Sequence, residues 1–329
     1  LDAVLAVAPG HTPANTQRAE LLAEQGDRDA LLAHYETWIS HAPSAEAAAT
    51  QKLHLASLLT ADPQHLPAGV HELEELVTSG IAVDDARRAL LGILAQQDPD
   101  EPAPEADGWR DAIFTAARLF ESGSAGDAPD AEKRVVVRAK LRATELGARG
   151  ALLRELGQLC ETSGDIAEAF QRLGQALEED PEDQALSERL ESMAVDHGVW
   201  DELVALYERC LARTDDLKDN AVVHLLWRLA QVFQRDLERP DDAAPRLREL
   251  LDRRPANIPA LEQLAAYHRS REAYADEVAV LAQWLEHGGE AERKPLRIRI
   301  AMLRMDELGD REGARSALED TLPEGAIDP

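Results

Sequence analysis

The sequence predicts an all-helical protein made of stacked pairs of antiparallel helices. Composition supports this: Ala and Leu contribute 56 and 47 of the 329 residues, whereas Val, Ile and Thr together contribute only 36. Ala and Leu favour helices, and β-branched residues favour strands. Apolar residues also recur three and four residues apart, the spacing of an amphipathic helix. A β-sandwich, a β-barrel and a doubly wound sheet are therefore disfavoured.

The clearest helix pair lies between Gly150 and Asp183. Gly164 and Asp165 separate the two helical stretches, since glycine permits a tight turn and aspartate caps the following helix. Pro181 ends the second stretch, because proline lacks an N–H and clashes with the preceding turn. Apolar and small residues line the facing sides of the two helices at Leu153, Leu156, Gly157, Cys160, Ala169, Leu173 and Ala176.

These nine positions, counting Gly164 and Pro181, resemble the signature of the tetratricopeptide repeat, a 34-residue helix–turn–helix. Leu153 stands where the family usually has Trp, and Cys160 where it usually has an aromatic residue. The resemblance implies an α-α superhelix, a right-handed solenoid of antiparallel helix pairs. It also implies a concave channel lined by the first helix of each pair.

Further units follow along the chain. Gly198 lies 34 residues after Gly164, and later units are expected at residues 221–255, 256–287 and 291–322. The first of these three has a turn that is longer by about one residue at 238–240. A longer period is also present, because the tripeptide at 228–230 resembles the one at 299–301, 71 residues later.

The N-terminal part joins the same series. Pro9, Pro13 and Trp38 recur 246 residues later at Pro255, Pro259 and Trp284. Residues 1–9 then correspond to the end of a second helix, so we expect a fragment of a longer array that begins within a repeat. The end of the chain at 323–329 has no polar capping helix, which favours continuation there too.

The middle of the chain is less regular. Helices are expected near 82–97, 108–122 and 131–146, with loops at 98–107 and 123–129, and about 18 helices in all. The loop at 98–107 holds three prolines and five carboxylates and is expected to be exposed. We therefore predict three segments: repeats at 1–97, an irregular junction with an extra helix at 98–146, and repeats at 147–329.

The charge limits the partners. With 63 acidic and 35 basic residues, the formal net charge is −28, which disfavours nucleic acids and anionic lipid surfaces and permits basic protein partners. No apolar run is long enough to span a membrane, and the N-terminus does not resemble a signal peptide, so a cytoplasmic location is expected. Cys160 and Cys210 lie among apolar helix positions and are expected to be buried and free.

No catalytic pattern is present in the sequence. It contains no glycine-rich phosphate loop, no Gly-x-Ser-x-Gly and no His-Glu-x-x-His motif. The acidic loop at 98–107 lacks the glycine and closing glutamate of a calcium loop. We predict no catalytic, cofactor-binding or metal-binding residues, and hence no enzyme.

The family resemblance implies which side chains face the groove. They are Arg154, Gln158, Glu161, Glu188, Ser192, His224, Trp227, Gln231, Arg235, Glu262, Arg269, Ile298 and Met302. Trp227 is either an anchor for a partner side chain or a packing residue against the next hairpin. The remaining tryptophans, at 38, 109, 200 and 284, are expected to be packing residues. Some family members grip a C-terminal carboxylate through Lys, Asn and Arg, but Gln158 and Ser192 replace the asparagines here and the lysines are missing.

The predicted function is a non-enzymatic scaffold that binds a peptide or protein in the concave groove. An alternative is a substrate-recruiting or regulatory arm of a larger multidomain enzyme, such as a kinase or transferase. RNA binding by a related helical repeat is disfavoured because such proteins are basic.

Overall fold

The computed structural model describes residues 1–122, 128–213 and 218–319. These residues form 18 α-helices and two short π-helical segments and contain no β-strand, which confirms the all-α prediction. The chain forms two compact units, residues 1–179 and 180–329.

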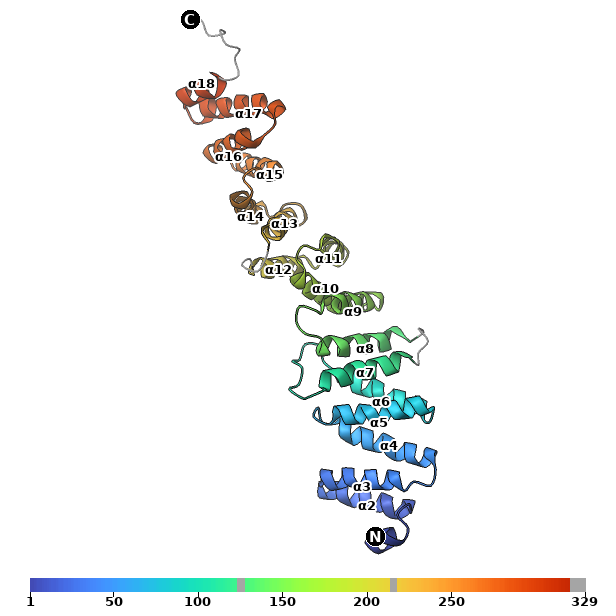
Figure 1. Ribbon diagram of the computed structural model, residues 1–329. Coiled ribbons are helices and arrows are strands. Elements are labelled where there is room, and N and C mark those ends of the chain that lie inside the picture. The colour runs from blue at the N-terminus through green and yellow to red at the C-terminus, as the bar shows by residue number, and fades with distance from the viewer. Residues whose placement is uncertain (123–127, 214–217, 320–329) are drawn as a thin grey trace, which may run out of the picture. The chain divides into compact units, whose positions relative to one another are not determined.

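In the first unit the helices follow one another in chain order from α2 to α10 (Figure 1). Helices α2 and α3, α4 and α5, and α9 and α10 form antiparallel pairs, whereas α6, α7 and α8 all pack on one another. The helices are α1 (Asp2–Val7), α2 (Thr12–Gln25), α3 (Arg28–Ser40), α4 (Ala45–Thr60), α5 (Leu66–Ser79), α6 (Val83–Ala95), α7 (Trp109–Ser122), α8 (Asp130–Ala143), α9 (Gly150–Thr162) and α10 (Ile166–Glu179).

A continuous apolar core joins helices α4 to α8. Leu73, Leu90 and Ile113 are fully buried in it, and Trp109 is 2% exposed. The guanidinium of Arg142 lies over the Trp109 ring, 5.6 Å from its centre. The stretch that departs from the repeat pattern in sequence is therefore well packed, since three helices bury their apolar faces together instead of in pairs.

The segment 98–107 between α6 and α7, here called the acidic strap, is not simply an exposed loop. Pro99 is buried, and its carbonyl accepts a hydrogen bond from Arg149 at 2.7 Å. Arg142 donates to the Glu101 carboxylate at 2.8 Å, and Arg172 of α10 pairs with Asp100. Asp98, Asp100 and Glu101 are exposed, as expected for this loop. In addition, Arg142 and Arg172 hold two of its carboxylates, and Arg149 holds the Pro99 carbonyl.

In the second unit four helix pairs follow one another, α11 with α12 through α17 with α18. The helices are α11 (Gln184–His197), α12 (Trp200–Leu211), α13 (Asp219–Gln231), α14 (Pro240–Arg253), α15 (Ile258–Ser270), α16 (Tyr274–His287), α17 (Glu290–Met302) and α18 (Arg311–Glu319). Every unit expected between 150 and 319 thus appears as two helices.

Two π-helical segments, η2 (Val232–Asp236) and η3 (Leu303–Glu307), extend α13 and α17 and begin 71 residues apart. A π-helical turn accommodates one additional residue, which explains the longer turn expected at 238–240. The equivalence continues past the segments: Glu238 has a φ of +52° and Gly309, its counterpart, a φ of +67°. The 71-residue period in sequence is therefore also a period in backbone conformation.

Several local expectations can be compared directly. Gly164 has a φ of +80°, and Asp165 Oδ1 accepts from the Glu168 amide, as expected for that turn. Trp38 and Trp109 are buried, but Trp200 and Trp284 are only half-buried. Both cysteines are buried and free. Expectations for 123–127 and 323–329 lie outside the described residues.

The units divide the chain after Glu179, so the segment 98–146 lies entirely inside the first unit. The three-segment division remains a prediction. None of the helices among the described residues is long and apolar enough to cross a lipid bilayer.

Candidate functional site

The residues predicted to line a groove fall on the first helix of each pair. In the second unit none of them is fully buried. His224, Trp227 and Gln231 of α13 are half-buried, and the others are exposed: Glu188 and Ser192 on α11, Arg235 on η2, Glu262 and Arg269 on α15, and Ile298 and Met302 on α17. These ten side chains define what is here called the first-helix face of the second unit.

A buried polar cluster joins α11, α12 and α13 beneath this face. Glu191 of α11 accepts two hydrogen bonds from Arg228 of α13, at 2.6 and 2.7 Å, and one from the Tyr207 hydroxyl at 2.8 Å. Burial and the neighbouring Glu191 charge raise the pKa of Tyr207, so the phenol stays protonated and donates. The cluster fixes α13 relative to α11.

The next helices are joined by further polar contacts. Gln231 Nε2 donates to Gln263 Oε1 of α15 at 2.8 Å. Glu277 of α16 is 0% exposed and accepts from Arg269 at 2.9 Å and from Arg299 at 3.1 Å. Arg269 was predicted to face a partner, but its guanidinium neutralises this buried carboxylate, whose isolation would be costly. Arg269 is therefore exposed on the first-helix face and also stabilises the fold through its ion pair with Glu277.

Helix α13 and the adjoining η2 carry three buried polar atoms that find no hydrogen-bond partner in the described part of the chain: His224 Nε2 and Gln231 Oε1 on α13, and Gln234 Oε1 on η2. Burial and the positive charge of Arg228 lower the pKa of His224, so the imidazole is neutral at pH 7. A neutral imidazole protonated at Nδ1 accepts at Nε2. Unpaired buried acceptors cost free energy, and a bound N–H or O–H donor would remove that cost.

Arg154, Gln158 and Glu161 belong to α9 in the first unit and are considered separately. Gln158 is exposed, and Arg154 and Glu161 are half-buried. Both charged side chains take part in interactions with neighbours. Of the three, only Gln158 presents a largely exposed polar group.

Sequence reasoning missed a cavity of about 540 Å³ in the first unit. It lies among α2, α3 and α4, and its walls include Tyr35 and Trp38, whose rings stack with centres 5.8 Å apart. One feature of the sequence points to this cavity. Trp38 is matched by Trp284, 246 residues later, but Tyr35 is matched by Leu281, so the second aromatic residue is particular to this repeat.

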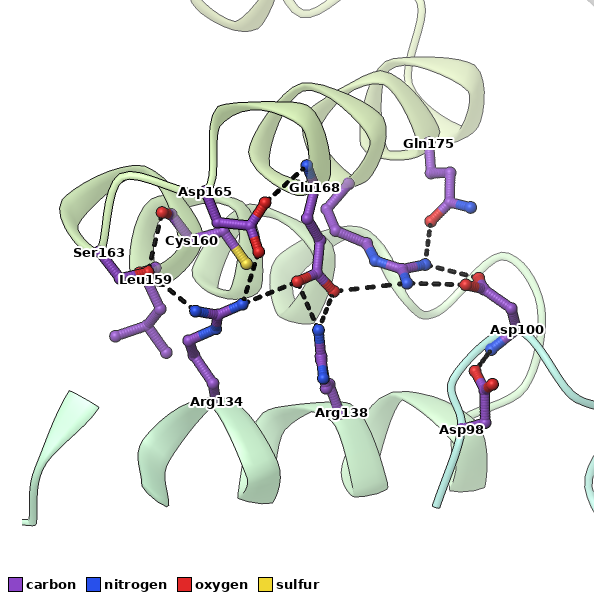
Figure 2. A network of polar contacts seen from close by, with 11 residues as sticks. Asp98, Asp100, Arg134, Arg138, Leu159, Cys160, Ser163, Asp165, Glu168 and Gln175 are labelled. Atoms are coloured by element: carbon purple, nitrogen blue, oxygen red, sulfur yellow. Dashed lines mark hydrogen bonds and ion pairs between the residues drawn. The ribbon is translucent and has the colours of Figure 1, made fainter. Parts of the chain in front are cut away.

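The densest charged network of the first unit joins α8 to α10 (Figure 2). Glu168 accepts from Arg134 at 2.8 Å and from Arg138 at 2.5 Å, and Arg134 also contacts Asp165 and Ser163. Burial alone would raise the pKa of Glu168, but the hydrogen bonds and charge of the arginines, with a hydrogen bond from the Cys160 thiol, lower it to about 2. Burial, together with the hydrogen bond and charge of Glu168, raises the pKa of Cys160 to about 11. This network joins two helices and holds an unreactive thiol.

Within the described ranges, no three His, Cys, Asp or Glu side chains are arranged to hold a metal ion.

The sequence model of the tetratricopeptide repeat family matches residues 185–221, which cover α11 and α12. Helix pairs also make up the rest of both units, except where α6, α7 and α8 pack as a group of three. Residues 185–221 therefore match a tetratricopeptide repeat, and the described residues form an array of helical repeats. No curated protein sequence shows a significant match to it.

The solved structures that resemble this chain share little sequence with it. The Pseudomonas aeruginosa protein pilF is 15% identical and matches 65% of this chain and 94% of its own, with a TM-score of 0.32. A repeat protein from Cytophaga hutchinsonii is 10% identical, with coverages of 83% and 96% and a TM-score of 0.34. Yeast Tom70 is 12% identical, with coverages of 93% and 84% and a TM-score of 0.29. TM-scores this low do not carry over any function.

Proposed function

We propose that this protein is a non-enzymatic scaffold that binds a peptide or protein partner on the first-helix face of its second unit. Tetratricopeptide repeats are typically protein-interaction modules. The observation that carries the proposal is a group on α13 and η2: the half-buried Trp227 and three buried polar atoms, His224 Nε2, Gln231 Oε1 and Gln234 Oε1, that find no partner among the described residues. An indole together with unsatisfied acceptors suits a polypeptide that offers an apolar side chain and backbone N–H donors.

The net charge of the chain favours a basic partner. On the first-helix face the exposed Glu188 and Glu262 are balanced by Arg235 and Arg269, but the whole chain carries −28. Complementary charge mainly accelerates association and selects against acidic partners, so binding should weaken as salt increases. We propose a cytoplasmic location, since neither of the two buried cysteines forms a disulfide.

The test uses the full chain and a displayed library of random peptides. Peptides selected by the unmodified protein are measured against Trp227→Ala and against Trp200→Ala, which removes a half-buried tryptophan from a second helix. Loss of an anchoring tryptophan should weaken binding by about thirtyfold, whereas Trp200→Ala should leave it within about twofold. Equal losses in both variants, with both still folded, would contradict the proposed surface.

A further inference from the structure

The cavity of the first unit has the size and lining of a ligand site. Its volume of about 540 Å³ lies within the usual range for binding pockets, roughly 300–1,000 Å³. Helices α2 and α4 form its two sides, and Leu31, Tyr35 and Trp38 of α3 line it from between them. The cavity is open on one side, and its apolar walls would cover the hydrocarbon part of a long side chain.

One polar group in the lining lacks a partner. Gln51 of α4 is 8% exposed, and its Oε1 forms no hydrogen bond within the described part of the chain. A buried amide oxygen without a donor costs free energy. A donor delivered into the cavity would satisfy this oxygen after a small rotation of the amide, whereas a purely apolar occupant would leave it unpaired.

The charge of the lining is negative. Glu20 lines the cavity, and no lysine or arginine does. The nearest basic residues along α2, α3 and α4 are engaged by other groups. Arg18 pairs with Asp2 at 2.8 Å, and Lys52 contacts Glu72 at 3.3 Å. Arg28 donates to the backbone carbonyl of Leu58, a lining residue, at 2.8 Å, but does not itself line the cavity.

We propose that this cavity binds a lysine or arginine side chain of the protein partner. The methylene stem packs on Tyr35 and Trp38, the charged head donates to Gln51 Oε1, and the Glu20 carboxylate attracts the charge. Long basic side chains are apolar along the stem and polar only at the tip, which matches this lining. The inference rests on the proposed scaffold function and adds a second contact region with a defined partner chemistry.

The experiment uses four pools of fluorescent heptapeptides, random except for a fixed central lysine, arginine, norleucine or glutamate. Binding to the full chain is measured by fluorescence anisotropy at low salt. Norleucine keeps the lysine stem without its charge and hydrogen-bond donors. We expect the lysine and arginine pools to bind at least about fivefold more tightly than the norleucine pool, and the glutamate pool to bind least.

Two variants locate the effect. Glu20→Gln should weaken the lysine pool by about threefold, and Gln51→Leu by about tenfold, because the charged donor loses its acceptor. Glu36→Gln is the matched control: it removes an exposed carboxylate from α3, outside the lining, and should change nothing beyond about twofold. Glu20 is exposed, so Glu20→Gln carries the test even if circular dichroism shows that Gln51→Leu is unfolded.

Equal binding of the norleucine and lysine pools would overturn the inference. So would lysine binding that neither Glu20→Gln nor Gln51→Leu weakens. The lysine preference should survive Trp227→Ala, because Trp227 belongs to the second unit. If Trp227→Ala leaves the binding of the selected library peptides unchanged, and the lysine preference of the heptapeptide pools is still present, the proposed surface on α13 is refuted and the cavity site is retained.

Discussion

The guanidinium of Arg172 donates two hydrogen bonds to the carboxylate of Asp100, at 2.5 and 2.7 Å, across 72 residues of sequence. The Arg172 side chain is only 5% exposed. These hydrogen bonds lower the pKa of Asp100. The acidic strap is thus held to α10 by a charge-assisted, two-point contact.

The first prediction concerns the strap. Asp100→Asn removes the charge that Arg172 binds, and the strap should open more often. Hydrogen exchange of the Asp100 and Glu101 amides, which donate to Asp98, should accelerate by about tenfold. Asp107→Asn, an exposed carboxylate in the same segment, is the control and should leave the exchange unchanged. Similar exchange in both variants would show that the contact does not hold the strap.

The second prediction follows from Glu168, whose side chain is 11% exposed among Arg134, Arg138 and Arg172. Its pKa is lowered from 4.5 to about 2, so its contribution is complete above pH 4.5 and is lost as the pH falls towards 2. Glu168→Gln should reduce the free energy of unfolding at pH 7 by about 3 kcal/mol.

The measurement is urea denaturation of both proteins at several pH values. The difference between unmodified protein and Glu168→Gln should shrink as the pH falls from 4.5 to 2. A difference that is constant over this range would mean that the ionisation of Glu168 does not contribute to stability.

The third prediction compares two glycines inside helices. A Cβ at Gly157 would lie 2.7 Å from Leu173 Cγ and Cδ2, whereas one at Gly92 meets no atom within 4 Å. Gly157→Ala should therefore destabilise the protein by about 1–2 kcal/mol through overpacking. Gly92→Ala should stabilise it by about 0.5–1 kcal/mol through helix propensity. Thermal denaturation measures both, and equal shifts would refute the close contact of α9 with α10.

The fourth prediction compares two tryptophans that the sequence alone does not distinguish. Trp109 is 2% exposed in the core of the first unit, and Trp284 is half-buried with its indole N–H donating to Glu292 at 3.1 Å. Trp109→Ala should cost about 3–5 kcal/mol and Trp284→Ala about 1–2 kcal/mol. Chemical denaturation tests the order, and a larger loss for Trp284 would contradict these burial differences.

The fifth prediction concerns Cys160, which is 0% exposed and whose pKa is raised to about 11. Because the thiolate is the reactive form, iodoacetamide should not modify this thiol in the folded protein at pH 8. Mass spectrometry after labelling gives the result, with protein in 6 M guanidinium as the positive control. Labelling of Cys160 within minutes under native conditions would argue against its burial beside Glu168.

The helix pairs could be predicted because their determinants are local. Gly157 lies against Ala169 and Leu173 within one repeat, and Gly164, with a φ of +80°, marks the turn between the two helices. The position of the acidic strap could not be predicted. Nothing near Asp100 in sequence indicates Arg172, and only the packing of α8, α9 and α10 brings them together.

The candidate surface was predicted in part for the same reason. The family resemblance placed Trp227 and Ile298 on the first helices, and both are at least partly accessible. It could not show that Arg269 pairs with the buried Glu277, because that partner lies on the following helix in a position that is usually apolar. The cavity beside Tyr35 could not be predicted, because it depends on the distance between α2 and α4. No local sequence pattern determines that distance.

The paired π-helical segments bear on how the second unit originated. Each adds a residue at the same point of a first helix, and neither α11 nor α15 contains one. The extra residue is present in every second hairpin, after α13 and α17. The simplest origin of this pattern is duplication of a gene segment that encodes two consecutive hairpins. We infer that the ancestral building block of this unit was a four-helix segment of 71 residues, already carrying its irregular turn when it was copied.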